Sequence, residues 1–195
     1  MNTRKTNQKL NQKNRISTPG FTLIELLVVI AILAVLAVAV TLILNPAELV
    51  RQGRDSTRLS DIGTIHRAIG LYFADRQEVT FDAECLCTYG TKASTTLNSG
   101  VCTNNATTTV DSNGWVPINF TEMSTGAPLS RLPLDPVNGA ANYYVFVSSS
   151  TETYELNANM ESVRYSNGGS DDVESKDGGS SDTWYEVGNA SALDL

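Results

Sequence analysis

The 195-residue sequence contains one histidine, His66, and three cysteines. A zinc site needs about four His, Cys or acidic ligands at recognisable spacing, and a nucleophilic site needs a base with an orienting partner. The pattern around His66 offers neither, and the sequence has no glycine-rich phosphate loop. We therefore expect no enzymatic activity, and we interpret His66 as a residue on the surface of a helix.

Charge is absent from Leu26 to Leu44. A helix rises about 1.5 Å per residue, so this run comes close to crossing the roughly 30 Å hydrocarbon layer of a membrane. Its apolar residues lie all round the helix, which excludes an amphipathic surface helix. The sequence therefore predicts a transmembrane segment at about residues 24–44, surrounded by lipid or by copies of itself.

Glu25 lies at the amino end of this apolar run. An unpartnered carboxylate costs on the order of 2.5–3.5 kcal/mol in a bilayer, so such residues are usually functional. The sequence between Arg15 and Arg51 contains no lysine, arginine or histidine that could pair with it. Cleavage before Phe21 would create an α-amino group one helical turn away, in the same chain or in a neighbouring copy. The alternative is that Glu25 reaches the membrane interface and stays hydrated.

The segment GFTLIE at residues 20–25, with the apolar run after it, resembles the class III signal of type IV pilins and of the pseudopilins of type II secretion and DNA-uptake systems. The resemblance implies that a prepilin peptidase cleaves between Gly20 and Phe21 and removes the basic leader, residues 1–20. The same enzyme would methylate the new amine with S-adenosylmethionine, giving N-methylphenylalanine at Phe21.

The resemblance further implies that Glu25 neutralises the Phe21 amine of an adjacent subunit during assembly. An inner-membrane assembly platform and its ATPase would draw subunits from the membrane into a helical homo-polymer. Surface pili, DNA-uptake pili and secretion pseudopili share this amino-terminal chemistry, so the motif points to all three.

The charge distribution predicts the orientation of the chain. Residues 1–20 contain five basic residues and no acid, so the remainder carries about −12 within the total of −7. Positive flanks stay in the cytoplasm, which places the amino terminus inside and the rest outside the cytoplasmic membrane. The acidic remainder lacks the basic patch of a nucleic-acid groove, so no direct nucleic-acid partner is expected. An ordinary secretory signal, cut after Ala37-Val38-Ala39, is an alternative, but Glu25 would interrupt its apolar core.

A second helical pattern follows Asn45-Pro46, a pair that can cap or kink a helix. Between residues 47 and 76, apolar side chains recur at spacings of three and four, namely Leu59, Ile62, Ile65, Ile69, Tyr72 and Phe73. We expect the charged residues to occupy the opposite, solvent-facing side: Arg51, Arg54, Asp55, Arg58, Asp61 and Arg67. Residues 21–76 are thus predicted as one long helix, bent or loosened near Pro46 and Gly53.

Residues 77–113 are rich in Thr, Ser, Asn and Gly and contain all three cysteines. In an exported segment, a disulfide of Cys85 or Cys87 with Cys102 would stabilise the fold by about 3 kcal/mol in the chain-entropy model. A Cys85–Cys87 bond would strain the backbone, so one thiol remains or pairs with another chain. We expect a long loop with little regular structure, suited to be a surface-variable or binding region.

Strand-like alternation appears in the second half of the chain. Residues 143–147 and 153–160 alternate on either side of a turn, which predicts an antiparallel hairpin, and residues 184–187 can add a last strand. The segment WVPINF at 115–120 contains Pro117 and suggests an edge strand or a bulge. The Leu-Pro-x-Asp-Pro connection at 132–136 is stiff and is similar to that of major pseudopilins.

These elements together predict an α+β, pilin-like fold. The long amino-terminal helix packs its apolar stripe on a small antiparallel sheet built from residues 114–160 and 184–187. Residues 77–195 form the exported globular head.

Residues 166–182 are acidic and rich in glycine and serine. Major pseudopilins as a family hold calcium in a carboxy-terminal loop, and five carboxylates here could serve such a hard cation: Asp171, Asp172, Glu174, Asp177 and Asp182. Their spacing does not fit an EF-hand, and such composition is also typical of a solvated loop. Calcium is the one cofactor that the sequence suggests.

Three functions remain as hypotheses. The leading one is a structural subunit of a type IV pilus or pseudopilus, polymerised through the helix at 21–44. The second is a monomeric, membrane-tethered binding or adhesion module that uses the 77–113 loop. The third, an exported enzyme, is opposed by the absence of any recognisable catalytic constellation.

Overall fold

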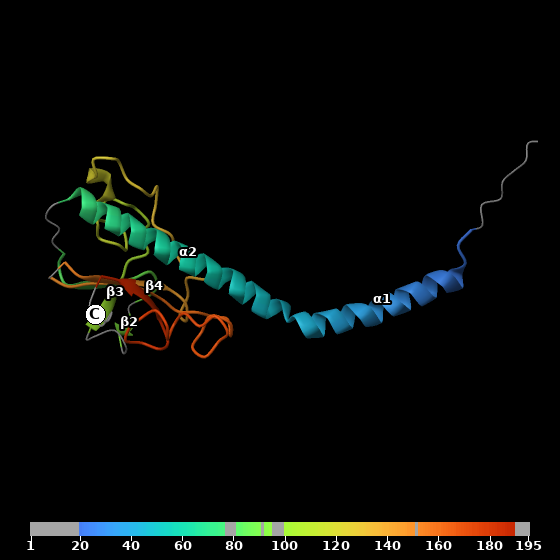
Figure 1. Ribbon diagram of the computed structural model, residues 1–195. Coiled ribbons are helices and arrows are strands. Elements are labelled where there is room, and N and C mark those ends of the chain that lie inside the picture. The colour runs from blue at the N-terminus through green and yellow to red at the C-terminus, as the bar shows by residue number, and fades with distance from the viewer. Residues whose placement is uncertain (1–19, 77–80, 91, 95–99, 151, 190–195) are drawn as a thin grey trace, which may run out of the picture. The chain divides into compact units, whose positions relative to one another are not determined.

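The structure, a computed structural model, describes residues 20–76, 81–90, 92–94, 100–150 and 152–189. The chain divides into two compact units, residues 1–44 and residues 45–195. The first contains helix α1 (Leu23–Leu44), and the second contains helix α2 (Pro46–Asp75) and a β-sheet (Figure 1). Residues 1–19 of the leader lie outside the described residues.

Helix α1 is apolar on every side, and no described residue of its unit covers it. Among the described helices, the stretch Leu23–Thr41 is long and apolar enough to cross a membrane, and it is not buried. Large side chains such as Leu23, Val35 and Ile43 are more than 70 % exposed. A surface of this kind needs lipid or another protein around it, because water is its least favourable environment.

Asn45 separates the two helices. Its backbone is left-handed, with φ 40° and ψ 72°, and Pro46 occupies the start of α2. Proline lacks an amide donor and disfavours the helical conformation of the residue before it, while its fixed φ suits the first turn of a helix. The expected single helix over 21–76 is therefore interrupted at Asn45. Gly53, the other expected weak point, lies inside α2 without a break.

The sheet has six strands in the order β2-β3-β1-β4-β5-β6. Their bounds are β1 Glu84–Cys87, β2 Lys92–Ser94, β3 Gly100–Asn104, β4 Tyr144–Ser148, β5 Tyr154–Ala158 and β6 Tyr185–Gly188. Neighbouring strands are antiparallel, except for the parallel pair β1 and β3. Strands β4, β5 and β6 coincide with the hairpin and last strand that the alternation predicts.

Residues 77–113 differ from their expected form. The sequence predicts a loop with little regular structure, whereas the structure contains β1, β2 and β3 there. β1 pairs along β4, and a disulfide between Cys85 and Cys102 joins β1 to β3. These strands are short and contain few large apolar residues, so they depend on pairing with other strands rather than on a local apolar pattern.

Residues 115–120 also differ, because they form no regular strand. The Ile118 amide donates a hydrogen bond to the Val116 carbonyl, on the other side of Pro117, at 2.8 Å. The β-type pairing near this segment is an isolated bridge between Asp111 and Asn119. Proline supplies no amide for a ladder. Trp115, Val116, Ile118 and Phe120 are nevertheless all buried, so this irregular segment contributes to the core.

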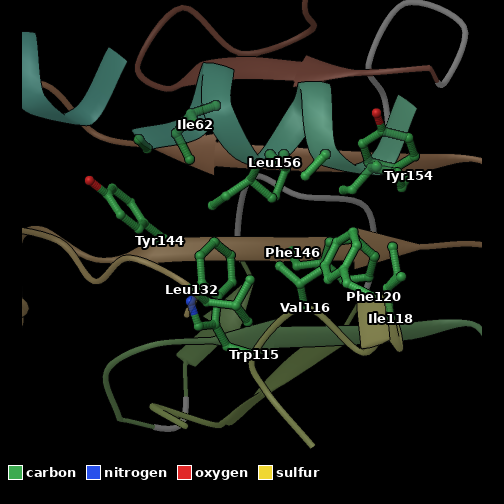
Figure 2. Close-up of a cluster of buried hydrophobic side chains, with 14 of the residues drawn as sticks. Ile62, Trp115, Val116, Ile118, Phe120, Leu132, Tyr144, Phe146, Tyr154 and Leu156 are labelled. Atoms are coloured by element: carbon green, nitrogen blue, oxygen red, sulfur yellow. The ribbon is translucent and has the colours of Figure 1, made fainter. Parts of the chain in front are cut away.

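The main core lies between α2, one face of the sheet and the 115–132 segment (Figure 2). The predicted stripe of α2 is confirmed, since Ile62, Ile65 and Ile69 are completely buried. Each such side chain contributes about 1.5–3 kcal/mol of transfer free energy. The remaining fully buried members include Trp115, Phe120, Leu132, Tyr144, Phe146 and Leu156.

Candidate functional site

Thr22 and Glu25 form a reciprocal cap at the start of α1. The Glu25 carboxylate accepts hydrogen bonds from the Thr22 amide at 2.9 Å and the Thr22 hydroxyl at 2.7 Å, while the Glu25 amide donates to the Thr22 hydroxyl at 3.3 Å. This is the capping box that Thr-x-x-Glu before an apolar run predicts. The sequence reasoning assigned Glu25 only to charge pairing and missed this second role, although the spacing signalled it.

Gly20 and Phe21 directly precede this cap. Phe21 is 83 % exposed, and, apart from the neighbouring residues in the chain, no described atom lies within 4 Å of the position that a Cβ on Gly20 would occupy. The peptide bond between them is therefore not packed against the other described residues.

Glu25 is the one charged residue on α1. Among the described residues no ion pair includes it, and its contacts come from Thr22 alone. A carboxylate has about four lone-pair positions, so the cap leaves room for a further donor. The geometry thus brings Gly20, Phe21 and Glu25 into one short segment in which the carboxylate can accept a cation.

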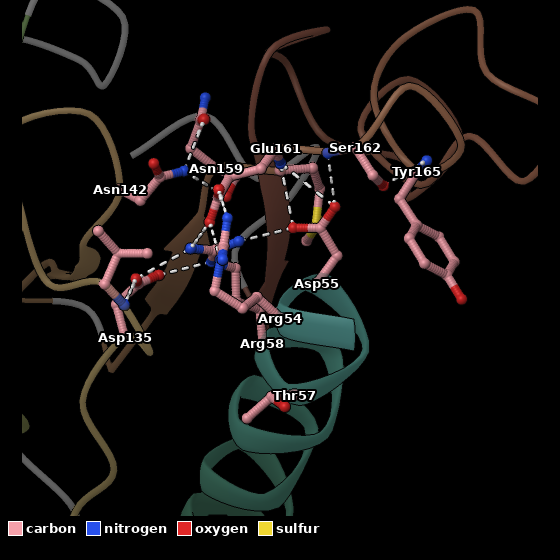
Figure 3. A network of polar contacts seen from close by, with 12 residues as sticks. Arg54, Asp55, Thr57, Arg58, Asp135, Asn142, Asn159, Glu161, Ser162 and Tyr165 are labelled. Carbon is pink, nitrogen blue, oxygen red and sulfur yellow. Dashed lines mark hydrogen bonds and ion pairs between the residues drawn. The ribbon is translucent and has the colours of Figure 1, made fainter. Parts of the chain in front are cut away.

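A second polar site lies within the other unit, around Arg58 (Figure 3). Arg58 is completely buried and binds three carboxylates, those of Asp55, Asp135 and Glu161. Its contact with Asp135 is bidentate, with Nε at 2.6 Å and Nη2 at 2.9 Å. Arg54 also pairs with Glu161. We call these five residues the Arg58 cluster.

The expected exposure of two charged residues on α2 was wrong. The sequence reasoning placed Asp55 and Arg58 on the solvent face, but both side chains are completely buried. Positions 55 and 58 continue the three-and-four spacing of Ile62, Ile65 and Ile69, so they belong to the core-facing stripe. Their position in line with the apolar stripe could have indicated that both charged residues are buried.

The backbone around the cluster is organised by the same carboxylates. Asp55 accepts the amides of Glu161 and Ser162. Asp135, in the stiff Leu-Pro-x-Asp-Pro connection, accepts the amides of Val137 and Asn138, which directly follow it. The hydrogen bond from Arg54, followed by those from Arg58, holds the pKa of Glu161 below its ordinary value. Burial acts to lower the pKa of Arg58, but the hydrogen bonds that Arg58 donates to Asp135 and Glu161 raise it overall. The cluster fixes α2 to two distant connections, and each of its carboxylates pairs with an arginine.

The cysteines divide into a disulfide and a thiol. Cys85 and Cys102 are bonded, one of the two pairings that the sequence left open. Cys87 is buried, and its Sγ donates to the carbonyl of Gly90 at 2.8 Å. A small apolar cluster of Cys87, Cys102 and Val145 lies on the sheet face opposite α2.

His66 lies half-buried on α2 and forms a hydrogen bond through Nδ1 with the hydroxyl of Tyr154, at 3.0 Å. Burial lowers its pKa, followed by the charge of Arg67. The neutral imidazole is therefore favoured at physiological pH. The sequence placed His66 on the helix surface, whereas the structure places it half-buried in contact with a core tyrosine.

The acidic segment 166–182 is folded by its carboxylates. Asp172 accepts hydrogen bonds from Gly168 and Ser175, and the Ser175 hydroxyl is the largest cause that lowers the pKa of Asp172 to about 2. Glu174 accepts the amides of Met160 and Asn167.

The remaining carboxylates of this segment are also placed. Asp171 pairs with Arg164, Asp177 accepts the amides of Gly179 and Glu186, and Asp182 is exposed. Within the described residues, no group of three or more His, Cys, Asp or Glu side chains is arranged to hold a metal ion. Calcium binding by these five acids stays a prediction.

Comparison with known proteins gives one match, at the amino-terminal end. No curated protein and no solved structure matches the chain. Residues 18–41 match the family model of the prokaryotic N-terminal methylation motif, a range that includes Gly20, Phe21, the Thr22–Glu25 cap and most of α1. The chain therefore carries the prepilin cleavage signal of type IV pilins and pseudopilins.

Proposed function

We propose that the protein is a structural subunit of a type IV pilus or pseudopilus filament. Prepilin peptidase cuts it between Gly20 and Phe21 and methylates the new amine. An inner-membrane assembly platform with its ATPase then polymerises the mature chains through α1. In this account the chain crosses the cytoplasmic membrane once before assembly, with its leader inside and residues 45–195 outside.

One observation carries the proposal: α1 combines an all-round exposed apolar surface with a single carboxylate one turn from the motif's cleavage position. The apolar surface suits α1 to a lipid bilayer before assembly and to packing against other α1 helices in a filament. The carboxylate would be costly in both environments without a cation. Cleavage supplies that cation, because it creates an α-amino group at Phe21.

The methylation that the motif implies leaves the Phe21 amine able to pair with Glu25. N-methylation keeps the amine basic, so a methylated Phe21 still carries a positive charge that Glu25 can bind. Each mature subunit contributes one such amine and one such carboxylate. Pairing between neighbours therefore leaves no net charge in the filament interior and fixes the axial register of one helix against the next.

The state of the first residue tests the proposed maturation. Mass spectrometry of the protein from its native membrane or from filaments should show a chain that begins at N-methylated Phe21. A chain that begins at Val40, after the Ala37-Val38-Ala39 pattern, would instead indicate ordinary signal cleavage. A chain that still begins at Met1 would also contradict the proposal.

A substitution series tests the role of Glu25 in assembly. Glu25→Ala and Glu25→Gln both remove the negative charge, and both should abolish filaments while the cleaved subunit remains in the membrane. Thr22→Val is the matched control, since it removes the hydroxyl of the helix cap and keeps the carboxylate. Filaments should persist in the control. If Glu25→Ala left filaments intact, the proposed role of Glu25 in assembly would be wrong. If the wild type formed no filaments, the second hypothesis of a tethered monomeric adhesion module would be favoured.

A further inference from the structure

The most exposed large apolar side chain described in residues 45–195 is that of Val163, which is 72 % exposed. It lies in a turn after β5, which a hydrogen bond from the Ser166 amide to the Ser162 carbonyl closes at 3.1 Å. We call residues 162–166 the Val163 turn. A single exposed valine needs no explanation by itself, so its surroundings decide what it does.

The Val163 turn is held against the first turns of α2. The Glu48 carboxylate accepts the Val163 amide at 2.8 Å, and the Asp55 carboxylate accepts the Ser162 amide at 2.8 Å. Ser162 and Asp55 are completely buried, which fixes the base of the turn. The exposed side chain of Val163 is therefore carried at a defined place beside the start of α2.

The start of α2 is itself apolar where it faces solvent. Leu49 and Val50 are more than half exposed. The acid between them and α1, Glu48, has a side chain that is only 16 % exposed and is bonded to the Val163 turn. Arg51, whose side chain is half exposed, follows directly. The exposed surface of the chain therefore stays largely apolar past the end of α1, as far as Arg51.

The length of the chain places this surface at the membrane boundary. The 22 residues of α1 span about 33 Å at 1.5 Å per residue, which already fills the roughly 30 Å hydrocarbon layer. Glu48 follows Leu44 by four residues, and a chain extends at most about 3.6 Å per residue, so Glu48 lies within about 15 Å of that end. The headgroup layer lies at this boundary, and the Val163 turn is bonded to Glu48.

The neighbours of Val163 are of the kinds that membrane interfaces favour. The guanidinium of Arg164 lies 5.3 Å from the centre of the Tyr165 ring. Figure 3 shows the Tyr165 side chain directed away from Arg58. Tyrosine and arginine suit the headgroup layer because each combines an apolar body with a polar tip.

We propose that the Val163 turn and the exposed residues at the start of α2 form a contact with the phospholipid headgroup layer of the membrane. Arg51 and Arg164 each lie beside an acid and leave no excess of positive charge, so the contact does not depend on anionic lipid. It holds the start of the folded unit at the membrane surface, and a subunit that leaves the membrane gives it up. The inference rests on the membrane insertion of α1 in the proposed function and on no step of assembly.

Quenching of tryptophan fluorescence by brominated lipid tests the contact in the full-length chain. Val163→Trp would be placed in phospholipid nanodiscs with one chain per disc, and the emission of the two native tryptophans, measured on the wild type, would be subtracted. Lipid brominated near the headgroup should remove most of the added emission, and lipid brominated near the bilayer centre should remove less. Leu49→Trp should give the same result, and it provides the test if Val163→Trp does not fold.

Two further variants make the outcome specific. Leu71→Trp is the matched control, because Leu71 is 54 % exposed and lies about 30 Å beyond Val50 on the same helix at 1.5 Å per residue, so it should escape quenching. Val35→Trp reports the insertion of α1, and lipid brominated near the bilayer centre should quench it. Without quenching at Val35→Trp, the membrane step of the proposed function fails and the contact fails with it. Quenching there but at neither Val163→Trp nor Leu49→Trp would overturn the contact alone.

Other outcomes would also overturn the contact. Equal quenching of Leu71→Trp and Val163→Trp would mean that the whole folded unit lies on the bilayer. A blue shift of the Val163→Trp emission that appears only when several chains share a disc, without quenching by lipid, would assign the surface to a second copy of the chain. Quenching that requires anionic lipid would contradict a contact without excess charge.

Discussion

Arg58 is completely buried among three carboxylates, so its charge balances the most polar part of the core. Removing one partner of a buried ion pair leaves the other charges uncompensated, at a cost of about 3–5 kcal/mol. We expect Arg58→Ala to lower the free energy of unfolding by that amount in a urea titration. Arg51→Ala, at an exposed position with a 3.9 Å contact to Glu48, should change it by less than about 1 kcal/mol. Equal effects of the two substitutions would contradict the role of Arg58.

Asp172 gives the protein a specific acid sensitivity. Its pKa is lowered to about 2 in the folded state, chiefly by the hydrogen bond from Ser175, against about 3.9 in an unfolded chain. A lowered pKa stabilises the fold fully above about pH 4, and this stabilisation is lost as the pH falls through about 2.

The measurement is the free energy of unfolding between pH 5 and pH 2, which we expect to fall less steeply in Asp172→Asn than in the wild type. Asp182→Asn, at an exposed position of the same segment, is the control and should keep the wild-type slope. An unchanged slope in Asp172→Asn would show that the hydrogen bonds to Asp172 do not contribute to acid stability.

At the scale of elements, α2 is fixed to the sheet by its apolar stripe. Ile65 is completely buried, and truncation of such a residue costs about 2–5 kcal/mol through lost transfer free energy and the cavity that remains. Ile65→Ala should therefore destabilise residues 45–195 strongly in thermal unfolding. Leu71→Ala on the same helix, where the side chain is 54 % exposed, should have a small effect.

The disulfide joins the neighbouring strands β1 and β3. Peptide mapping under non-reducing conditions should recover Cys85 linked to Cys102 and leave Cys87 alkylatable only after denaturation, because Cys87 is buried. Cys102→Ser should lower the free energy of unfolding by about 2–4 kcal/mol. Recovery of a Cys87–Cys102 peptide as the main product would contradict the observed pairing.

The elements that the sequence predicts well are those with a local pattern. The charge-free run gives α1, the three-and-four spacing gives α2, and alternation gives β4, β5 and β6. Strands β1 to β3 are missed because they are short and show no alternating pattern, and because β1 is held by pairing with the distant strand β4. The cysteines indicated a disulfide, but they did not indicate that its ends lie on strands. The interruption at Asn45 follows from Asn45-Pro46, but the sequence alone left a bend and a break equally possible.

The two sites differ in the same way. Gly20, Phe21 and Glu25 lie in one continuous motif, so the sequence identifies them together. Arg58 meets Asp135 and Glu161 across 77 and 103 residues, a distance over which no spacing rule applies. The burial of Asp55 and Arg58 could have been inferred from their position in the stripe, but their partners could not.

At the scale of the whole molecule, the chain joins an exposed apolar helix to a separate folded unit. The folded unit buries an apolar core and contains ion pairs between its own residues. In contrast, the apolar surface of α1 is exposed, and Glu25 has no ion pair among the described residues. An exposed apolar surface that needs lipid or protein around it is therefore a property of α1. This division is what the proposed function requires, because polymerisation must leave residues 45–195 unchanged.

A mixing experiment decides whether Glu25 serves its own chain or a neighbour. If the carboxylate binds the Phe21 amine of an adjacent subunit, a Glu25→Gln subunit that enters a filament leaves that neighbour's amine without a partner. Co-expression of wild-type and Glu25→Gln chains should then reduce filament number more steeply than the fraction of variant, as counted by electron microscopy. Pairing within one chain predicts a proportional decrease, because wild-type subunits would be indifferent to their neighbours. Thr22→Val mixed in the same ratios controls for the helix cap and should leave filament number unchanged.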